Sequence, residues 1–341
     1  MTPFDATGPA LPAWPIADRG SPDAADAAGD DVADVDVAAV AAAADVAADD
    51  AAADDVVARL AGCGIGAIAV SGSQLVVASG SMGCLRVTDP ADPDAGGRVL
   101  GAHGSYVPAL LARGGALFSG GSDGRILAWR LGADNLSVVV GAHRAGVAAM
   151  VATADGDVVS AGHDGYVMSW RKGTPRLLAS HRRGVRVAAA LASGALVVAG
   201  RDGALLCWRS GGGERPVELR QRCREATLAM TPLPSGELVT ATGHFGVVRR
   251  WRDLSPGGWP DEIGVHGGWV LAVVILDGGR VAAVGGDHVT VWDLRAGREQ
   301  RIPLDPGMHA TKAVALPAGG GLAVLGSCGS FRLVEVADLA A

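Results

Sequence analysis

Short apolar runs separated by turn residues fill the chain from residue 56 onward. In one stretch, the apolar run "GVAAMVAT" at 146–153 is followed by the turn "ADGD", and the run "VVSAG" at 158–162 is followed by "HDG". The alternating run "YVMSW" and the short run "PRLLAS" complete the stretch. Short runs of this kind, bounded by Gly and Asp, predict β-strands joined by tight hairpins. The stretch therefore predicts four strands, and no helical periodicity interrupts them.

The same four-strand pattern recurs at a nearly fixed period. Short motifs such as "GAH", "ASH" and "GVH" precede each copy and end at His103, His143, His181, His266 and His309, with Cys63 and Cys223 at the same place in the other two copies. The steps between these seven positions are 40, 40, 38, 42, 43 and 43 residues. A period of about 40 residues is typical of repeat architectures whose units bury their faces against one another. The sequence predicts seven four-stranded units.

Four positions of each unit carry side chains that recur at the repeat spacing. They are a His before the first strand, a Ser or Thr in the second strand, an Asp in the following turn and a Trp in the third strand. Two units hold all four, namely His103, Ser119, Asp123 and Trp129, then His143, Ser160, Asp164 and Trp170. This pattern resembles the WD-repeat family of β-propellers. The resemblance implies that the four side chains form a hydrogen-bonded network, which gives a buried His and Asp the partners they need.

The other units match this signature less fully. The unit of His181 keeps Asp202 and Trp208 but has Val198 in the Ser position. The next unit has Thr240 and Trp251, with Phe245 near the Asp position, and the unit of His266 keeps Trp292. The first and last units are the weakest, with Met82 and Cys328 in the Asp place and Thr88 and Val334 in the Trp place. In four units Arg follows the Trp, at Arg130, Arg171, Arg209 and Arg252.

We therefore expect an all-β fold, a seven-bladed β-propeller of four-stranded antiparallel blades spanning residues 56–341. The last unit supplies only three strands before the chain ends. Residues 56–62, "VVARLAG", lie where every other unit has its outer strand. We expect this segment to complete the last blade and close the ring, which hides the sheet edges.

Residues 1–55 form an acidic, low-complexity tail. They contain thirteen Asp, no Glu and one Arg, a charge of −12, so the remaining residues carry +5 of the chain's net −7. We expect the tail to be disordered or partly helical, because interior Asp residues repel one another and compete with a helical backbone. Two roles stay open: the tail keeps the protein soluble, or it rests on arginines of the propeller in a salt-sensitive, autoinhibitory contact.

Composition also bears on the compartment. No run of eighteen apolar residues predicts a transmembrane helix, and no secretory signal precedes the repeats. Five scattered cysteines without a C-x-x-C motif indicate reduced thiols and disfavour a zinc site. We expect a cytoplasmic protein without membrane partner, metal or cofactor. The Ala- and Arg-rich composition favours a GC-rich bacterial genome.

The repeated His and Asp residues invite a catalytic interpretation, but they fall at the signature positions and are expected to be scaffold. No G-x-S-x-G, H-E-x-x-H or Walker-type motif is present. The predicted innermost runs, such as "VAAMVA", offer no carboxylate and a single charge, Arg186. We therefore expect no enzyme. The alternative, a propeller enzyme with a site in the central channel, would be favoured by carboxylates and a metal converging there.

The resemblance implies a protein partner, bound on the narrow face that the turns before the first strand and after the second strand build. We expect this face to present Tyr106, Arg144, His163, Arg182, Arg183, Arg186, Arg201, Arg224 and Trp269. The clustering of arginines in successive units favours an acidic peptide or protein surface. Scarce aromatics and the −12 tail disfavour nucleic acid. A sensor or targeting subunit of a bacterial defence or signalling system is a further alternative to a general scaffold.

Overall fold

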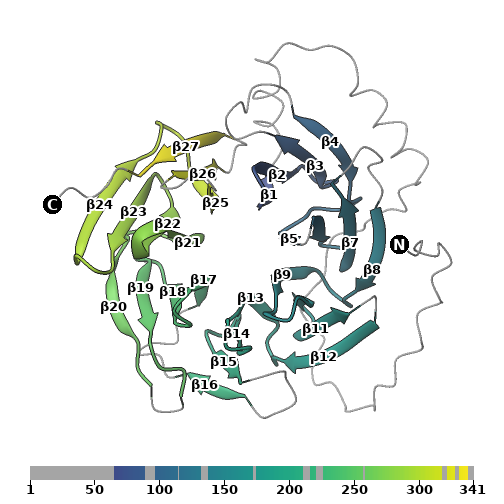
Figure 1. The fold of residues 1–341 in the computed structure, drawn as a ribbon, viewed down its shortest axis with the longest axis horizontal. Coiled ribbons are helices and arrows are strands. Elements are labelled where there is room, and N and C mark those ends of the chain that lie inside the picture. The colour runs from purple at the N-terminus through teal and green to yellow at the C-terminus, as the bar shows by residue number, and fades with distance from the viewer. Residues whose placement is uncertain are drawn as a thin grey trace. The chain divides into compact units, whose positions relative to one another are not determined.

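The computed structural model describes residues 65–88, 97–113, 115–131, 137–171, 174–209, 216–219, 226–255, 258–316, 321–326 and 330–336. These residues form 27 β-strands and one short 3-10 helix, Asp277–Gly279. The strands build seven antiparallel sheets arranged in a ring (Figure 1). The seven-bladed propeller predicted from the repeat is therefore confirmed.

In every blade the strands follow one another from the innermost to the outermost. Blade 1 contains β1 (Ile65–Ser71), β2 (Gln74–Ser79), β3 (Cys84–Thr88) and β4 (Arg98–Ala102). Blade 2 contains β5 (Ala109–Arg113), β6 (Ala116–Gly120), β7 (Arg125–Arg130) and β8 (Ser137–Ala142). Blade 3 contains β9 (Val147–Ala152), β10 (Val158–Gly162), β11 (Tyr166–Arg171) and β12 (Thr174–Ser180). Blade 4 contains β13 (Val185–Ala190), β14 (Leu196–Gly200), β15 (Leu205–Trp208) and β16 (Val217–Leu219).

Blades 5 and 6 have the same plan. Blade 5 contains β17 (Thr227–Pro232), β18 (Leu238–Thr242), β19 (Val247–Trp251) and β20 (Asp261–Val265). Blade 6 contains β21 (Ala272–Leu276), β22 (Arg280–Gly285), β23 (His288–Asp293) and β24 (Arg298–Pro303). Blade 7 contains, among the described residues, β25 (Ala310–Ala315), β26 (Gly321–Gly326) and β27 (Phe331–Glu335). We call the four strand positions of a blade a, b, c and d from the inside outward.

Burial follows the strand position. Every residue of the b strands β10, β14, β18 and β22 is buried, because neighbouring blades cover both faces of the sheet. This explains why these strands read as continuous apolar runs rather than alternating ones. The d strands β8, β12 and β24 are mostly exposed, since they form the outer rim.

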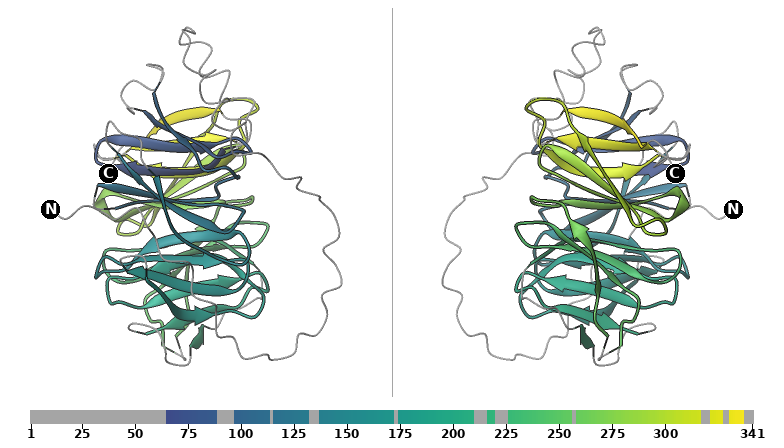
Figure 2. Two further views of the ribbon diagram at one scale, coloured as in Figure 1. Left: turned by 90° about the vertical axis from the view of Figure 1, so that its right-hand side faces the viewer. Right: turned by 90° about the vertical axis from the view of Figure 1, so that its left-hand side faces the viewer.

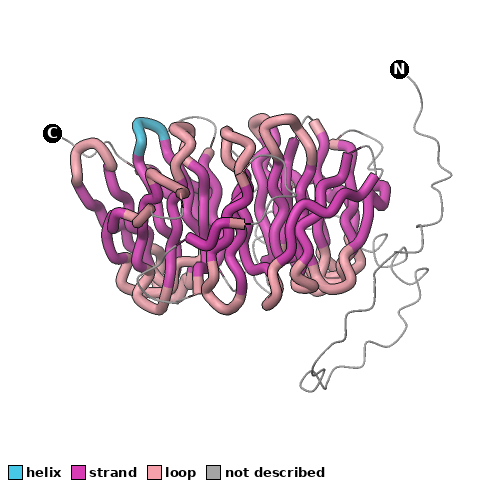
Figure 3. Tube along the Cα trace, turned by 90° about the horizontal axis from the view of Figure 1, so that it is seen from below, coloured by secondary structure: helices cyan, strands magenta, loops and turns pink. Residues whose placement is uncertain are grey.

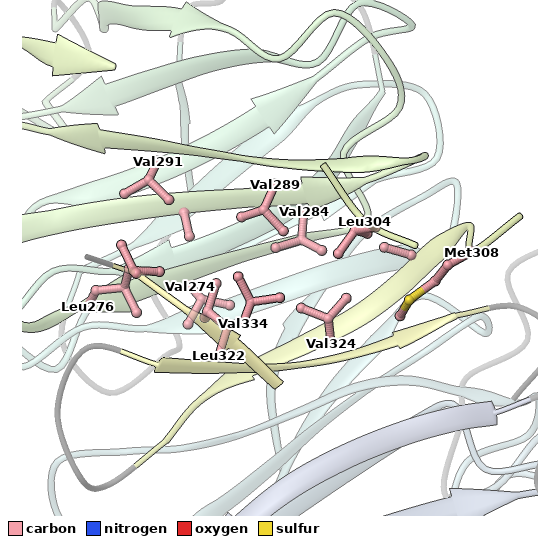
Figure 4. Close-up of a cluster of buried hydrophobic side chains, with 13 residues drawn as sticks. Val274, Leu276, Val284, Val289, Val291, Leu304, Met308, Leu322, Val324 and Val334 are labelled. Carbon is pink, nitrogen blue, oxygen red and sulfur yellow. The ribbon is translucent and has the colours of Figure 1, made fainter. Parts of the chain in front are cut away.

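The core consists of layers between blades rather than one central cluster. The largest layer joins blades 6 and 7, where Val289, Val291, Leu322 and Val324 interdigitate (Figure 4). An equivalent layer joins blade 7 to blade 1 through Leu75, Val77, Ala323 and Leu325. Strands β25 and β1 also lie in contact, and Figure 2 shows the yellow strands of blade 7 beside the purple strands of blade 1. The described residues therefore close the ring by packing blade 7 against blade 1.

The small residue two positions before the repeat His has a packing role. A Cβ at Gly141 would lie 2.0 Å from Cζ3 of Trp170, the tryptophan of the next blade, and Gly264 stands in the same relation to Trp292. Such contacts leave no room for a side chain. The "GAH" motif and the tryptophan about 27 residues later are therefore two halves of one interblade contact.

Three sequence-based expectations lie outside the described residues: the acidic tail 1–55, the closing strand 56–62 and Arg224. The propeller belongs to the compact unit Ala48–Ala341. Among the residues that the structure describes, no helix is long and apolar enough to span a membrane.

Candidate functional site

The turns before strand a and after strand b meet on one face of the ring. In blade 3, the His163 N–H in the b–c turn donates to the Gly146 carbonyl in the segment that enters strand a, at 2.9 Å. The Val147 N–H donates to the Gly121 carbonyl of blade 2, at 2.9 Å, and so links neighbouring blades. Figure 3 shows the loops gathered on the two faces of the propeller, with the strands between them. We call the face with these turns the entry face.

A four-residue network supports this face in blade 2. The Trp129 indole N–H donates to Ser119 Oγ at 2.7 Å, and Ser119 Oγ lies 2.8 Å from His103 Nδ1. His103 Nε2 lies 3.3 Å from Asp123 Oδ1. A carboxylate only accepts hydrogen bonds, so Nε2 carries the imidazole proton and Nδ1 accepts from the Ser119 hydroxyl. The chain of donors from Trp129 to Asp123 ends at the b–c turn and fixes it.

Blade 3 has the same network with the imidazole turned over. The Trp170 indole N–H donates to Ser160 Oγ at 2.7 Å, and Ser160 Oγ lies 2.7 Å from His143 Nε2. His143 Nδ1 lies 3.1 Å from both oxygens of Asp164. Asp164 also accepts from the Arg144 N–H at 2.9 Å and the Tyr166 N–H at 3.0 Å. The carboxylate thus joins the entry segment to the b–c turn.

The titration of these groups reflects their partners. Burial raises the pKa of the Asp164 carboxyl, but hydrogen bonds from His143, Tyr166 and Arg144 outweigh it, so the pKa lies below its ordinary value. The pKa of Asp123 is also lowered, because hydrogen bonds from Arg125 outweigh the effect of burial. Burial lowers the pKa of His103 against the attraction of Asp123. The lowered pKa values keep Asp123 and Asp164 ionised and His103 neutral, as a structural role requires.

Blade 4 keeps His181, Asp202 and Trp208 but not the network. His181 Nε2 lies 3.6 Å from Asp202 Oδ1 and is buried without a hydrogen-bond partner. The Arg183 N–H donates to His181 Nδ1 at 3.3 Å. Val198 has no hydroxyl to connect His181 to Trp208, so the four-residue network expected from the resemblance is incomplete here.

Blade 5 lacks the His and connects its residues differently. The Trp251 indole N–H donates to Thr240 Oγ1 at 3.0 Å, as the alignment predicts. The buried Arg249 guanidinium donates to Thr242 Oγ1 at 2.5 Å. Phe245, near the Asp position, is 69% exposed. The b–c turn of this blade therefore carries an aromatic side chain outward instead of a carboxylate inward.

In blade 6 the hydroxyl has moved from strand b to strand c. The His266 Nε2–H donates to the Gly285 carbonyl at 3.0 Å, and Thr290 Oγ1 lies 2.8 Å from Nδ1. Ala283 occupies the serine position, paired with Thr290 across the sheet. The Trp292 indole donates to Glu299 at 3.1 Å instead. The signal for this exchange was in the sequence, since Thr290 stands two residues before the Trp and thus on the same strand face.

His288 completes the blade 6 arrangement. Its ring stacks on His266 with centroids 4.0 Å apart, and Nε2 lies 2.9 Å from the His266 carbonyl. Its Nδ1 lies 2.9 Å from Asp287 Oδ1. Burial lowers the pKa of His266 to about 4. His266 is therefore neutral at physiological pH, and sequence reasoning did not anticipate its partner His288.

Blade 7 departs from the repeat signature of the other units. His309, expected among the scaffold histidines, is exposed, and Met308 is buried between blades 6 and 7 instead. The aligned Asp and Trp positions of this unit hold Cys328 and Val334, which give an imidazole no charged partner. Lys312, three residues after His309, lies within strand β25, where burial lowers its pKa.

Five of the predicted binding residues form a continuous group on the entry face of blades 3 and 4. We call Arg144, His163, Arg182, Arg183 and Arg201 the arginine sector; all five are exposed. The segments are linked in series, because Gly184 lies against the His163 backbone and its carbonyl accepts from the Arg201 N–H at 3.4 Å. Within the part of the chain that the structure describes, none of the four arginines forms an ion pair with a carboxylate.

The remaining predicted residues lie elsewhere on the same face. Arg186 is exposed near the start of β13, the innermost strand of blade 4. Tyr106 is exposed beside Gly66 of blade 1, and its carbonyl accepts from the Ser122 N–H at 2.8 Å. Trp269 is 48% exposed in the segment that enters blade 6.

Sequence reasoning missed the neighbours of Trp269. The His244 ring meets the indole edge-to-face, with centroids 4.4 Å apart and planes at 88°. Phe245, which follows His244 in the b–c turn of blade 5, is exposed, and so is Leu271, which lies two residues after Trp269 and just before β21. We call His244, Phe245, Trp269 and Leu271 the aromatic cluster. The sequence signal was Phe245 at the place of the signature Asp, a departure that leaves the side chain no network to join.

No family model and no curated protein matches this sequence. Among solved structures, the chain is similar to the WD40 β-propeller domain of Doa1, with 18% sequence identity and a TM-score of 0.67. The match covers 81% of this chain and 94% of that one. Together with the seven blades and the networks of blades 2 and 3, this similarity shows that the chain has the WD40 β-propeller fold.

Proposed function

We propose that the protein is a non-catalytic interaction platform that binds an acidic peptide or protein surface across the arginine sector. The WD40 propeller is commonly a protein-interaction scaffold. The observation that carries the finer proposal is the exposure of four arginines on adjoining turns without a described carboxylate to neutralise them. Charges in such an arrangement attract ligands of opposite charge and increase the rate of encounter.

The networks beneath the sector support the proposal. Asp164 is held by His143 and by backbone N–H groups, so its charge is used within the scaffold. The guanidinium groups stand on turns whose backbones are hydrogen-bonded to one another. A pre-organised surface loses less conformational freedom when a ligand binds.

The innermost strands support a role without catalysis. Across β1, β5, β9, β13, β17, β21 and β25, the described a strands contain no Asp or Glu. Their charged residues are Arg113, Arg186 and Lys312. The converging carboxylates that would favour a channel-centred enzyme do not come from these strands.

The test uses a fluorescein-labelled twelve-residue peptide of Asp, Glu and Gly, measured by fluorescence anisotropy with the full chain. Charge reversal by Arg182→Glu with Arg183→Glu should weaken binding by at least tenfold, because two attractive contacts become repulsive. The matched control is Arg130→Glu with Arg209→Glu, which reverses the charge of two exposed arginines. Arg130 ends strand β7 and Arg209 follows strand β15, and these ends of the c strands lie away from the entry face.

The control variant should bind like the wild-type protein, and affinity should fall as salt rises from 20 to 500 mM. Equal losses in both variants would assign binding to net charge alone. Unchanged binding in the Arg182 and Arg183 variant would refute the arginine sector as the site.

A further inference from the structure

The aromatic cluster exposes large apolar side chains from two different elements at one boundary between blades. Phe245 lies in the b–c turn of blade 5, and Trp269 and Leu271 lie in the segment that leads into blade 6. Trp259 is also half-exposed in blade 5, but it lies just before strand d, outside the entry turns that carry the cluster. Adjacent exposed aromatics on a folded surface are typical of interaction sites, whereas single ones are ordinary.

Several contacts hold the segment around Trp269. Trp269 makes the edge-to-face contact with His244, and its backbone carbonyl presses on Gly285, where a Cβ would lie 1.8 Å from that oxygen. The neighbouring Val270 is fully buried, and the Leu271 N–H donates to the Val284 carbonyl at 2.9 Å. The backbone around Trp269 is therefore held in place, and the indole, which packs edge-to-face on His244, is still 48% exposed. A fixed aromatic surface is suited to receive an apolar side chain at low entropic cost.

The position of the cluster relates it to the arginine sector. The sector ends at Arg201 in the b–c turn of blade 4, and the cluster begins at His244 in the b–c turn of blade 5, the next blade of the ring. The innermost strands β13, β17 and β21 lie in contact in that order. An extended ligand that follows the entry face therefore meets guanidinium groups on two blades and then an apolar surface.

We infer that the aromatic cluster binds a large apolar side chain of the same ligand, so that the partner segment carries an aromatic or long aliphatic residue next to an acidic run. This inference rests on the proposed function and adds the second determinant of the ligand. Carboxylates complement the arginines, and the uncharged surface of Phe245, Trp269 and Leu271 complements the apolar residue. We infer a peptide segment rather than a membrane surface, because the cluster lies on the blade next to the exposed arginines, so that one extended ligand reaches both.

The experiment compares three labelled twelve-residue peptides on the full chain by fluorescence anisotropy. The first has a Trp beside six Asp or Glu residues, the second replaces the Trp with Ala, and the third keeps the Trp but replaces the acids with Asn and Gln. We expect the first peptide to bind at least tenfold more tightly than the second. Phe245→Ala should reduce this ratio to less than threefold, because it removes the most exposed ring of the cluster.

Two variants serve as controls. Trp259→Ala removes a similarly exposed aromatic outside the cluster and should leave the ratio unchanged. Arg182→Glu with Arg183→Glu should weaken the first two peptides by the same factor and keep their ratio. Phe245 is so exposed that its truncation leaves the fold intact, which a thermal melt verifies; Trp269→Ala then provides a second variant with the same expected result.

The outcomes separate the inference from the proposed function. If the wild-type protein binds both acidic peptides equally, or if the ratio survives Phe245→Ala, the inference is overturned while the acidic ligand stands. If no acidic peptide binds in a salt-dependent manner, the proposed function fails. Binding to vesicles containing 30% anionic lipid that depends on Phe245, without discrimination among the peptides, would assign the cluster to a membrane and also overturn the inference.

Discussion

The tryptophan network of blade 3 gives a quantitative prediction about stability. Trp170→Phe removes the indole N–H that donates to Ser160 at 2.7 Å. A lost buried hydrogen bond costs about 1 kcal/mol. The smaller ring also leaves a cavity of about 40 Å³, which at about 24 cal/mol per Å³ adds about 1 kcal/mol, besides the lost transfer free energy. We expect the free energy of unfolding to fall by about 2–3 kcal/mol.

Trp259→Phe is the first comparison. This side chain is 52% exposed, and surface substitutions of this kind change stability by about 0.5 kcal/mol or less. Urea unfolding followed by circular dichroism measures both. With an m value of about 3 kcal/mol per M, the Trp170 midpoint should shift by about 0.7–1 M. Equal losses for Trp170→Phe and Trp259→Phe would refute the assigned register of blade 3.

Trp208→Phe isolates the hydrogen bond. Trp208 is as deeply buried as Trp170, but Val198 replaces the serine in its blade. Its substitution should therefore cost about 1 kcal/mol less than that of Trp170. A double-mutant cycle of Ser160→Ala and Trp170→Phe should show a coupling energy of about 1 kcal/mol. No coupling, together with equal costs at Trp170 and Trp208, would show that the network contributes packing alone.

Other contacts lead to three shorter predictions. Gly141→Ala should destabilise the fold by about 1–3 kcal/mol, because the new Cβ would lie 2.0 Å from Trp170 Cζ3. The control is Gly268→Ala, whose new Cβ would meet no atom within 4 Å. Equal urea midpoints for the two variants would contradict the contact between Gly141 and Trp170. Burial lowers the pKa of His266 in the folded protein to about 4. As the pH falls, the His266 imidazole is therefore protonated in the unfolded chain before it is protonated in the folded one. The stability that neutral His266 contributes is lost as the pH falls from about 6.5 to 4. That loss, on the order of 3 kcal/mol, should be largely absent in His266→Gln and present in the exposed His163→Gln, as measured by urea titration at each pH; parallel pH profiles would argue against the burial of a neutral imidazole. Deletion of residues 1–50 should leave a cooperatively melting protein and deletion of 1–63 should not, because 56–62 is expected to complete blade 7; similar melting temperatures would rule out that closing strand.

The sequence by itself determined the number of blades, the order of their strands and the networks of blades 2 and 3. These features repeat, and each repeat places its hairpin turns, its His and its Trp at a fixed distance from the last. A blade cannot bury its faces alone, so seven copies of the pattern already specify a stacked ring. Ser119 and Ser160 were recognisable because their position is defined by strand register, which has a period of two.

Only the tertiary structure decided what happens where a unit departs from the pattern. Thr290 on strand c takes the place of the missing strand b hydroxyl, because both positions face the same histidine, His266. His309 turns to solvent and Met308 is buried, since no charged partner stands at the aligned positions of blade 7. The exposure of Phe245 and the edge-to-face contact of His244 with Trp269 depend on two segments about 25 residues apart in sequence. Burial and side-chain contact are properties of the neighbours that folding brings together, and a repeat pattern specifies those neighbours only where the repeat is intact.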